Sequence, residues 1–159
     1  MSSYIDRVLQ PGETVRYSGT LHWVIFLPGL VLVVFGVVGL LTMLIWPGAG
    51  HIFRTFYIVF GLASVFGVMH LLSAWVRQQT TEIAVTNHRI IYKIGLVSRR
   101  SVEMNMDKVE SVDVNQDIFG RLFDYGTVTI RGTGAGLEPL ITIASPLALR
   151  NAITVGPTS

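Results

Sequence analysis

The chain contains no cysteine and few charged residues. Without cysteine it cannot form a disulfide, use a thiol nucleophile or build a cysteine-ligated metal site. Only 14% of its residues are Asp, Glu, Lys or Arg, whereas a soluble domain normally carries about 25%. A composition this poor in charge predicts that part of the chain lies in a lipid bilayer.

The few charges leave two long gaps. No Asp, Glu, Lys or Arg occurs in Tyr17–Phe53 or in Thr55–Val76. The first gap contains the segment Trp23–Trp46, which is apolar almost throughout, and the second gap is similar. Each segment reaches the roughly 20 residues that a membrane-spanning helix needs. Because Pro47–Gly50 is typical of a turn, we predict a hairpin of two membrane-spanning helices.

The orientation of the hairpin follows from the basic residues near its ends. The turn side carries Arg54, whereas the other side carries Arg7, Arg16, Arg77 and Arg89. Cytoplasmic segments next to membrane helices carry an excess of Lys and Arg. We therefore expect a multi-pass protein with both termini in the cytoplasm.

Small residues follow one side of each predicted helix. They are Gly29 and Gly36 in the first helix and Ala63, Gly67 and Ala74 in the second. Small side chains let two helices approach closely in lipid. The simplest interpretation packs the two stripes against each other, and the alternative uses one stripe for self-association. His70 lies on the second stripe, where an ionisable group is either functional or reaches the interface.

After the second gap the hydrophobic period changes to two. Short segments of this kind run over 82–85, 89–94, 97–103, 109–114, 127–131 and 140–144. Such spacing predicts a small antiparallel barrel or sandwich. The alternation over 15–19 predicts a further strand that pairs with this domain. Ser145-Pro146 should begin a short helix. Three apolar side chains of that helix would close one end of the barrel: Leu147, Leu149 and Ile153.

Two motifs stand out in this strand-rich half. One is Thr86-Asn87-His88-Arg89-Ile90-Ile91 followed by Gly95. The other is the run Gly120-Arg121-Leu122-Phe123-Asp124-Tyr125-Gly126-Thr127-Val128. Together with Pro146, they resemble the bacterial pleckstrin-homology (PH) family of small membrane proteins, from Trp23 to about Ile153. The resemblance implies an inner-membrane protein with a PH-like barrel of two orthogonal antiparallel sheets and a C-terminal helix. Seven motif positions are expected to be structural: Thr86, Asn87, Arg89, Gly95, Gly120, Arg121 and Gly126.

These patterns predict three parts and few chemical sites. The parts are a cytoplasmic N-terminal segment with a strand (1–21), the helical hairpin (22–76) and a cytoplasmic PH-like domain (77–159). The histidines lack metal-ligand spacing, and no Ser/His/Asp set or carboxylate pair indicates catalysis. We therefore expect no enzyme activity, metal or cofactor. Basic and acidic residues are equally numerous after Arg77, which argues against nucleic-acid binding.

Four basic residues are the candidates for contact with anionic lipid headgroups: Arg77, Lys93, Arg99 and Arg100. Each basic residue near an anionic surface contributes about 1 kcal/mol of attraction. The alternative interpretation is a solvated strand whose charges pair with acids such as Glu103.

The segment Gln116–Tyr125 has the apolar spacing of a single helical turn. We expect Ile118, Phe119 and Leu122 to pack on the barrel. The alternative is a surface that binds a partner.

These observations favour a non-enzymatic membrane scaffold or adaptor that presents a cytoplasmic PH-like domain. Its expected partners are membrane lipids and other membrane proteins or a second copy of the chain. Two alternatives remain: a lipid-headgroup-binding module at the inner-membrane surface, and an accessory subunit of a membrane enzyme or transporter.

Overall fold

The chain forms two compact units. The computed structural model describes residues 5, 8–46, 48, 50–95, 100–133 and 139–154. One unit is Trp23–Val76, and the other combines Met1–His22 with Arg77–Ser159. The segment before the helices therefore belongs to the same unit as the segment after them.

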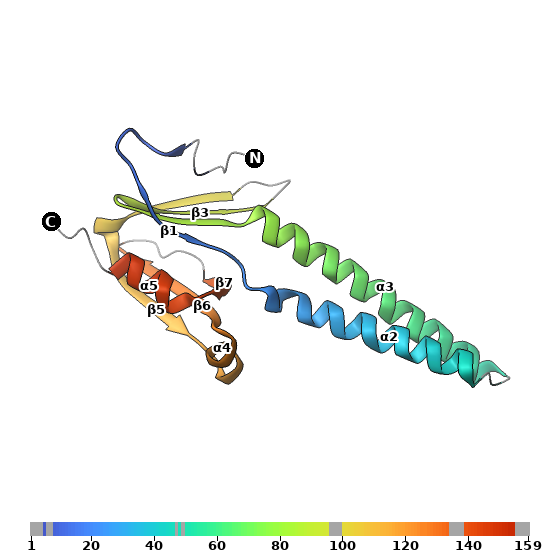
Figure 1. Ribbon diagram of the computed structural model, residues 1–159. Coiled ribbons are helices and arrows are strands. Elements are labelled where there is room, and N and C mark those ends of the chain that lie inside the picture. Colours follow the sequence, from blue (N-terminus) through green and yellow to red (C-terminus); the bar gives the residue numbers. More distant parts are fainter. Residues whose placement is uncertain are drawn as a thin grey trace. The chain divides into compact units, whose positions relative to one another are not determined.

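The first unit is a pair of helices that lie side by side (Figure 1). A short 3-10 helix, η1 (Trp23–Phe26), leads into α2 (Leu27–Ile45), and α3 covers His51–Thr80. The segments Trp23–Ile45 and His51–Thr80 are long and apolar enough to cross a membrane. The second helix extends beyond the predicted Thr55–Val76 at both ends, because no helix-breaking residue stands at either limit.

The second unit contains two antiparallel sheets, as the predicted fold class requires. The first sheet has the order β1-β2-β3-β4, and the second has the order β5-β6-β7. The strands of the first sheet are β1 (Val15–Gly19), β2 (Glu82–Thr86), β3 (Arg89–Ile94) and β4 (Arg100–Asn105). Those of the second are β5 (Val109–Asn115), β6 (Tyr125–Gly132) and β7 (Leu140–Ala144). The 3-10 turn η2 (Met106–Lys108) joins the sheets.

The strand predicted before the helices is present and pairs as expected. β1 is antiparallel to β2, with Val15 opposite Thr86 and Gly19 opposite Ile83. Further along, Leu21 forms a bridge with Ile143 of β7. The N-terminal segment thus contacts both sheets before the chain enters η1.

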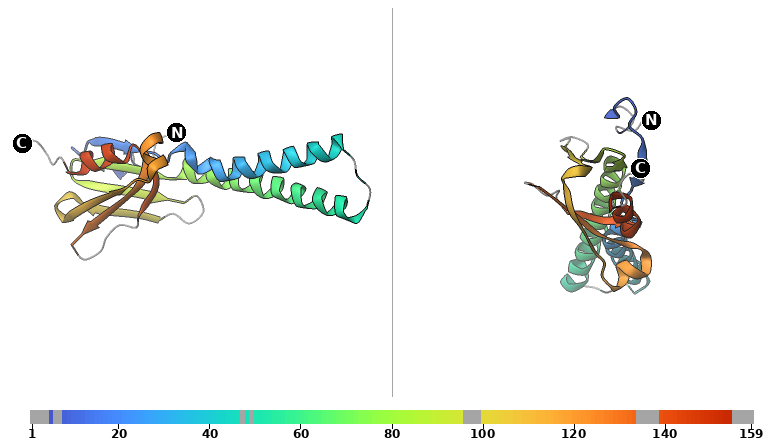
Figure 2. Two further views of the ribbon diagram at one scale, coloured as in Figure 1. Left: turned by 90° about the horizontal axis from the view of Figure 1, so that it is seen from below. Right: turned by 90° about the vertical axis from the view of Figure 1, so that its left-hand side faces the viewer.

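The core lies between the sheets and beneath a C-terminal helix. Its fully buried side chains include Ile83, Val85, Ile90, Val128, Ile130, Leu140, Ile143 and Leu149. The helix α5 (Pro146–Thr154) contacts β1 and β2 of one sheet and β5 and β6 of the other (Figure 2). Leu149 and Ile153 are buried as expected, but Leu147 is 45% exposed. The prediction for Leu147 was wrong because it lies on the outer face of α5.

Candidate functional site

The first family-like motif lies at the hairpin between β2 and β3, and it fastens the N-terminal segment to the sheet. The guanidinium of Arg89 donates to Glu13 twice, from Nη2 to Oε2 at 2.9 Å and from Nε to Oε1 at 3.0 Å. A second ion pair joins Arg89 Nη1 to Glu103 Oε2 at 2.7 Å. Its Nη2 also donates to the Val8 carbonyl at 2.8 Å. One arginine therefore connects the N-terminal segment, β3 and β4.

Thr86 and Asn87 complete this attachment. The Thr86 hydroxyl donates to Glu13 Oε1 at 2.7 Å and accepts from the Arg89 N–H at 3.0 Å. Asn87 exchanges two hydrogen bonds with Thr14: its side-chain oxygen accepts from the Thr14 N–H at 3.0 Å, and its own N–H donates to the Thr14 carbonyl at 3.2 Å. The motif therefore has a structural role in joining segments that are distant in sequence. Gly95 ends β3 in a left-handed backbone conformation, with φ 95°.

Glu13 carries its charge in a buried position. Its residue is 8% exposed. Burial raises the pKa of this carboxyl. Hydrogen bonds from Arg89, the Gln10 N–H and Thr86, together with the charge of Arg89, outweigh burial and lower its pKa to about 2. The hydrogen bonds that Arg89 donates to Glu13, together with the charges of Glu103 and Glu13, raise the pKa of Arg89, although burial opposes them. The pair therefore stays ionised across the physiological pH range.

Sequence reasoning found three residues of this network and missed Glu13. The available signal was its position directly after the Pro11-Gly12 turn, where an acid precedes a strand. An acidic residue there is equally compatible with solvent exposure. Only the antiparallel pairing of β1 with β2 brings it to Arg89.

The second motif holds a short helix, α4 (Ile118–Phe123), at the end of β5. Asp117 caps the helix by accepting a hydrogen bond from the Gly120 N–H. Asp124 ends it in a left-handed conformation with φ 57°. The Ser145 hydroxyl donates to the Asp124 carboxylate, which fastens α4 to the start of α5.

The motif glycines leave no room for a side chain. A Cβ on Gly120 would lie 2.6 Å from the Tyr125 carbonyl oxygen, and one on Gly126 would lie 2.8 Å from the Asn115 carbonyl oxygen. Gln116 donates from its side-chain amide to the carbonyls of Gly120 and Tyr125, at 3.2 and 3.0 Å. The position of α4 is therefore fixed by its surroundings, whereas Arg121 on it is exposed.

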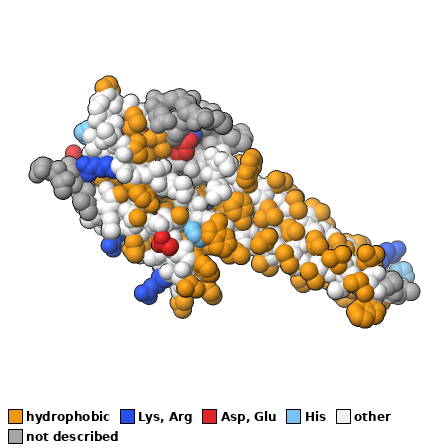
Figure 3. Space-filling view, viewed as in Figure 1, with side chains coloured by type: hydrophobic (Ala, Val, Ile, Leu, Met, Phe, Trp, Pro, Cys, Tyr) orange, Lys and Arg blue, Asp and Glu red, His pale blue; other side chains and the backbone are white. Residues whose placement is uncertain are grey.

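The predicted packing of α4 on the barrel is wrong. Ile118 is 84% exposed, Phe119 63% and Leu122 73%. Hydrophobic side chains gather over α4 at the lower edge of the molecule in Figure 3. The caps and close glycine contacts turn the apolar side of the helix outward. These side chains therefore form an exposed apolar cluster on α4.

The four candidate basic residues are not gathered into one described cluster. Arg77 is exposed near the end of α3, while Lys93 on β3 pairs with Glu82 at 3.2 Å. Arg99 and the side chain of Arg100 lie outside the described part of the structure.

The small-residue stripes lie between the two helices. A Cβ on Gly67 would lie 2.7 Å from the Val33 backbone nitrogen and 2.9 Å from the Gly29 carbonyl oxygen. A Cβ on Gly36 would lie 2.6 Å from the Phe60 carbonyl oxygen. Ala74 is buried and Ala63 half-buried, whereas His70 is exposed. These contacts favour packing within the hairpin over self-association through the same stripes.

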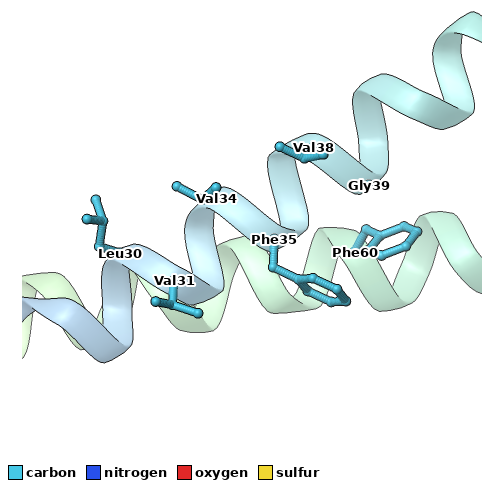
Figure 4. Close-up of a pocket in the computed structure, with 7 residues that line it drawn as sticks. All are labelled: Leu30, Val31, Val34, Phe35, Val38, Gly39 and Phe60. Carbon is cyan, nitrogen blue, oxygen red and sulfur yellow. The ribbon is translucent and has the colours of Figure 1, made fainter.

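An apolar groove runs along α2. It has a volume of about 500 Å³ and is lined by Leu30, Val31, Val34, Phe35, Val38, Gly39 and Phe60 (Figure 4). All of its side chains are hydrocarbon, so it can take an alkyl chain but cannot orient a polar substrate. Among the residues that the structure describes, no group of His, Asp and Glu could hold a metal ion.

A sequence model of the bacterial PH domain family matches residues 20–154. The chain belongs to the bacterial PH domain family. No curated protein and no solved structure matches the chain.

The family match begins at residue 20, after the N-terminal segment that contains Glu13 and β1. Both motifs of this bacterial PH domain lie within residues 20–154, but Glu13 and β1 precede them. The structure adds them to the first sheet, where Glu13 is the ionic partner of the motif residue Arg89. The matched region thus depends on contacts from outside it.

Proposed function

We propose that this bacterial PH protein is a membrane-anchored adaptor without enzymatic activity, which binds another protein through the edge of its second sheet. The anchorage is supported by two helices that are long and apolar enough to cross a bilayer. The adaptor role is supported by a sheet unit whose segments are joined by the hydrogen bonds of Arg89 and Thr86. We place the protein in the bacterial inner membrane with both termini in the cytoplasm, on the basis of its family and its basic residues.

The observation that carries the proposal is the open edge of β5. Among the described strands, β5 pairs with β6 alone. Beside it lies a groove lined by β5 residues such as Val109, Ser111 and Val112 and by Ile153 and Thr154 of α5. An extended peptide can add to such an edge through main-chain hydrogen bonds, while the groove accepts alternate side chains.

A matched pair of variants tests this binding mode. Ser111→Lys places a lysine on β5 opposite Arg131, and Ser101→Lys places one on the edge strand β4 opposite Lys93. Both changes put a charge on an exposed edge position next to a basic residue, but only the first blocks the groove. A charged edge strand opposes strand addition.

The measurement is co-purification of the full chain from its own membranes in mild detergent. We expect one protein to remain bound to the wild type and to Ser101→Lys, and to be lost with Ser111→Lys. Retention by Ser111→Lys, or no bound protein in the wild type, contradicts the proposal. A bound membrane enzyme or transporter would identify the chain as an accessory subunit, and binding of anionic lipid alone would favour the headgroup alternative.

A further inference from the structure

We propose that α4 inserts its apolar side into the surface of the bilayer that carries the helical hairpin. In this arrangement Ile118, Phe119 and Leu122 lie among the upper parts of the acyl chains, and Arg121 lies among the lipid phosphates. The inference rests on the membrane anchorage proposed above and adds a second contact with lipid.

The first argument is the chemistry of α4. Four of its six residues are Ile, Leu or Phe, and one is Arg. Ile118, Phe119 and Leu122 are each more than half exposed. Single exposed hydrophobic residues are normal, but a contiguous cluster is characteristic of an interaction surface. An arginine beside such a cluster suits an interface, because its long side chain can extend to the phosphates while its stem stays in apolar surroundings.

The second argument is that α4 cannot turn this cluster inward. Asp117 and Asp124 hold its two ends, and Gly120 and Gly126 pack directly against backbone oxygens. Burying Ile118 and Leu122 would require α4 to rotate, and these contacts oppose that rotation. The exposed cluster is therefore a fixed feature of the fold.

The third argument is the position of α4 along the chain and in the sheet unit. Tyr125 follows α4 closely, and its ring stacks on His22 with 5.3 Å between the ring centroids. The His22 N–H donates to the Thr142 carbonyl at 2.8 Å, so His22 is held by the second sheet. The next residue, Trp23, begins the first apolar segment. His22, after which the chain leaves the sheet unit, is thus next to Tyr125, which follows the C-terminal end of α4. This proximity favours lipid over a protein as the occupant.

The absence of cysteine allows a direct test with single-cysteine variants of the full chain. Leu122→Cys reports on α4, and Leu30→Cys reports on an exposed position of α2. Glu110→Cys reports on the end of β5 that lies away from α4, where Glu110 is exposed. Each variant is labelled with an environment-sensitive fluorophore and reconstituted into phosphatidylcholine vesicles. Part of the lipid carries a nitroxide near the top of its acyl chain, which quenches fluorophores at that depth.

We expect quenching at Leu30 and Leu122 and none at Glu110. Quenching at Leu30 without quenching at Leu122 overturns the inference and leaves the anchorage intact. No quenching at Leu30 refutes the anchorage itself. Equal quenching at Glu110 and Leu122 also overturns the inference, because α4 would then have no special contact with lipid.

A second measurement separates insertion from mere proximity. The label is moved to Phe119→Cys, and Ile118 and Leu122 are both changed to Ser or both changed to Met. We expect the serine pair to lose the quenching and the methionine pair to keep it, with the same thermal unfolding in both. Unchanged quenching in the serine pair overturns the inference.

Discussion

Four hydrogen bonds reach the buried carboxylate of Glu13. The Arg89 guanidinium donates two of them, and the Thr86 hydroxyl and the Gln10 N–H donate one each. A buried charge is costly unless its oxygens are hydrogen-bonded and paired with an opposite charge. Here both conditions are met. Removing the negative charge of Glu13 should therefore lower the free energy of unfolding, because Arg89 loses its buried partner.

We predict that the sheet unit loses stability in acid through Glu13. The folded pKa of about 2 lies below the ordinary value of 4.5. A depressed pKa means that the stabilisation is fully present above about pH 5 and is lost as the pH falls toward 2. The loss amounts to about 3 kcal/mol. It is measured as the free energy of unfolding in urea, followed by the circular dichroism of the β-sheets in detergent.

Two variants serve as controls for this prediction. Glu13→Gln should lower the stability at neutral pH by about 3 kcal/mol and remove most of the pH dependence. Glu103→Gln changes the other ionic partner of Arg89, whose side chain is 34% exposed compared with 1% for Glu13. It should cost less than about 1 kcal/mol and keep the pH dependence. Equal losses for the two variants would contradict the assignment.

Single residues of the network were predictable only where a motif contained them. Thr86, Asn87 and Arg89 are recognisable in the sequence as a unit, because they share one hairpin. Glu13 and Thr14 are separated from them by both apolar helices. Their partnership depends on the register of β1 against β2, and this register is set by the fold as a whole.

The helical hairpin is held by close backbone contact at its glycines. We predict that Gly67→Leu forces α2 and α3 apart, because even a Cβ there would lie 2.7 Å from the Val33 nitrogen. Overpacking of this kind typically costs about 1–3 kcal/mol. Thermal unfolding of the helices in mild detergent measures the loss.

Gly61→Leu is the matched control on the same helix. A Cβ at Gly61 meets no atom within 4 Å, so this change should leave the unfolding temperature nearly unaltered. A similar loss for both variants would contradict the assignment of the loss to contact with α2, because leucine favours a helix more than glycine does.

Helices and strands were predictable where their hydrophobic pattern was compatible with only one arrangement. The alternation in β2 and the long apolar runs each allow a single arrangement. The pattern of α4 does not: Ile118, Phe119 and Leu122 form one face, but the spacing does not say whether that face points to the sheet or to its surroundings. The side is chosen by Asp117, Gly120 and Gly126, whose contacts are tertiary.

At the scale of the whole molecule, we predict the side of the membrane on which each part lies. His51→Cys, at the exposed start of α3, should react with a membrane-impermeant thiol reagent in intact cells. Arg150→Cys, exposed on α5, should not. The reason is the excess of basic residues on the side of the sheet unit. The measurement is labelling before and after the cells are permeabilised.

Permeabilised cells provide the control for Arg150→Cys. Permeabilised cells must label it, which demonstrates that the thiol is accessible. Labelling of Arg150→Cys and protection of His51→Cys in intact cells would reverse the orientation and exclude cytoplasmic partners.

The overall architecture was predictable because two independent signals agreed. Long apolar runs identified the helices, and strand spacing with two motifs identified the PH-like sheets. The ends of the helices were harder to predict than their presence. The helix α3 continues to Thr80, past the predicted limit at Val76, and the residues in between are compatible with either a helix or a strand.

The pairing of β1 with β2 also sets an order of events during synthesis. The ribosome makes β1 before the two apolar helices and β2 after them, so Val15 has no partner until Thr86 has been made. At about 5–20 residues per second, this delay lasts several seconds. During that time β1 has no β2 to pair with, and Glu13 has no Arg89. Closure of the first sheet can therefore occur only after both helices have left the ribosome.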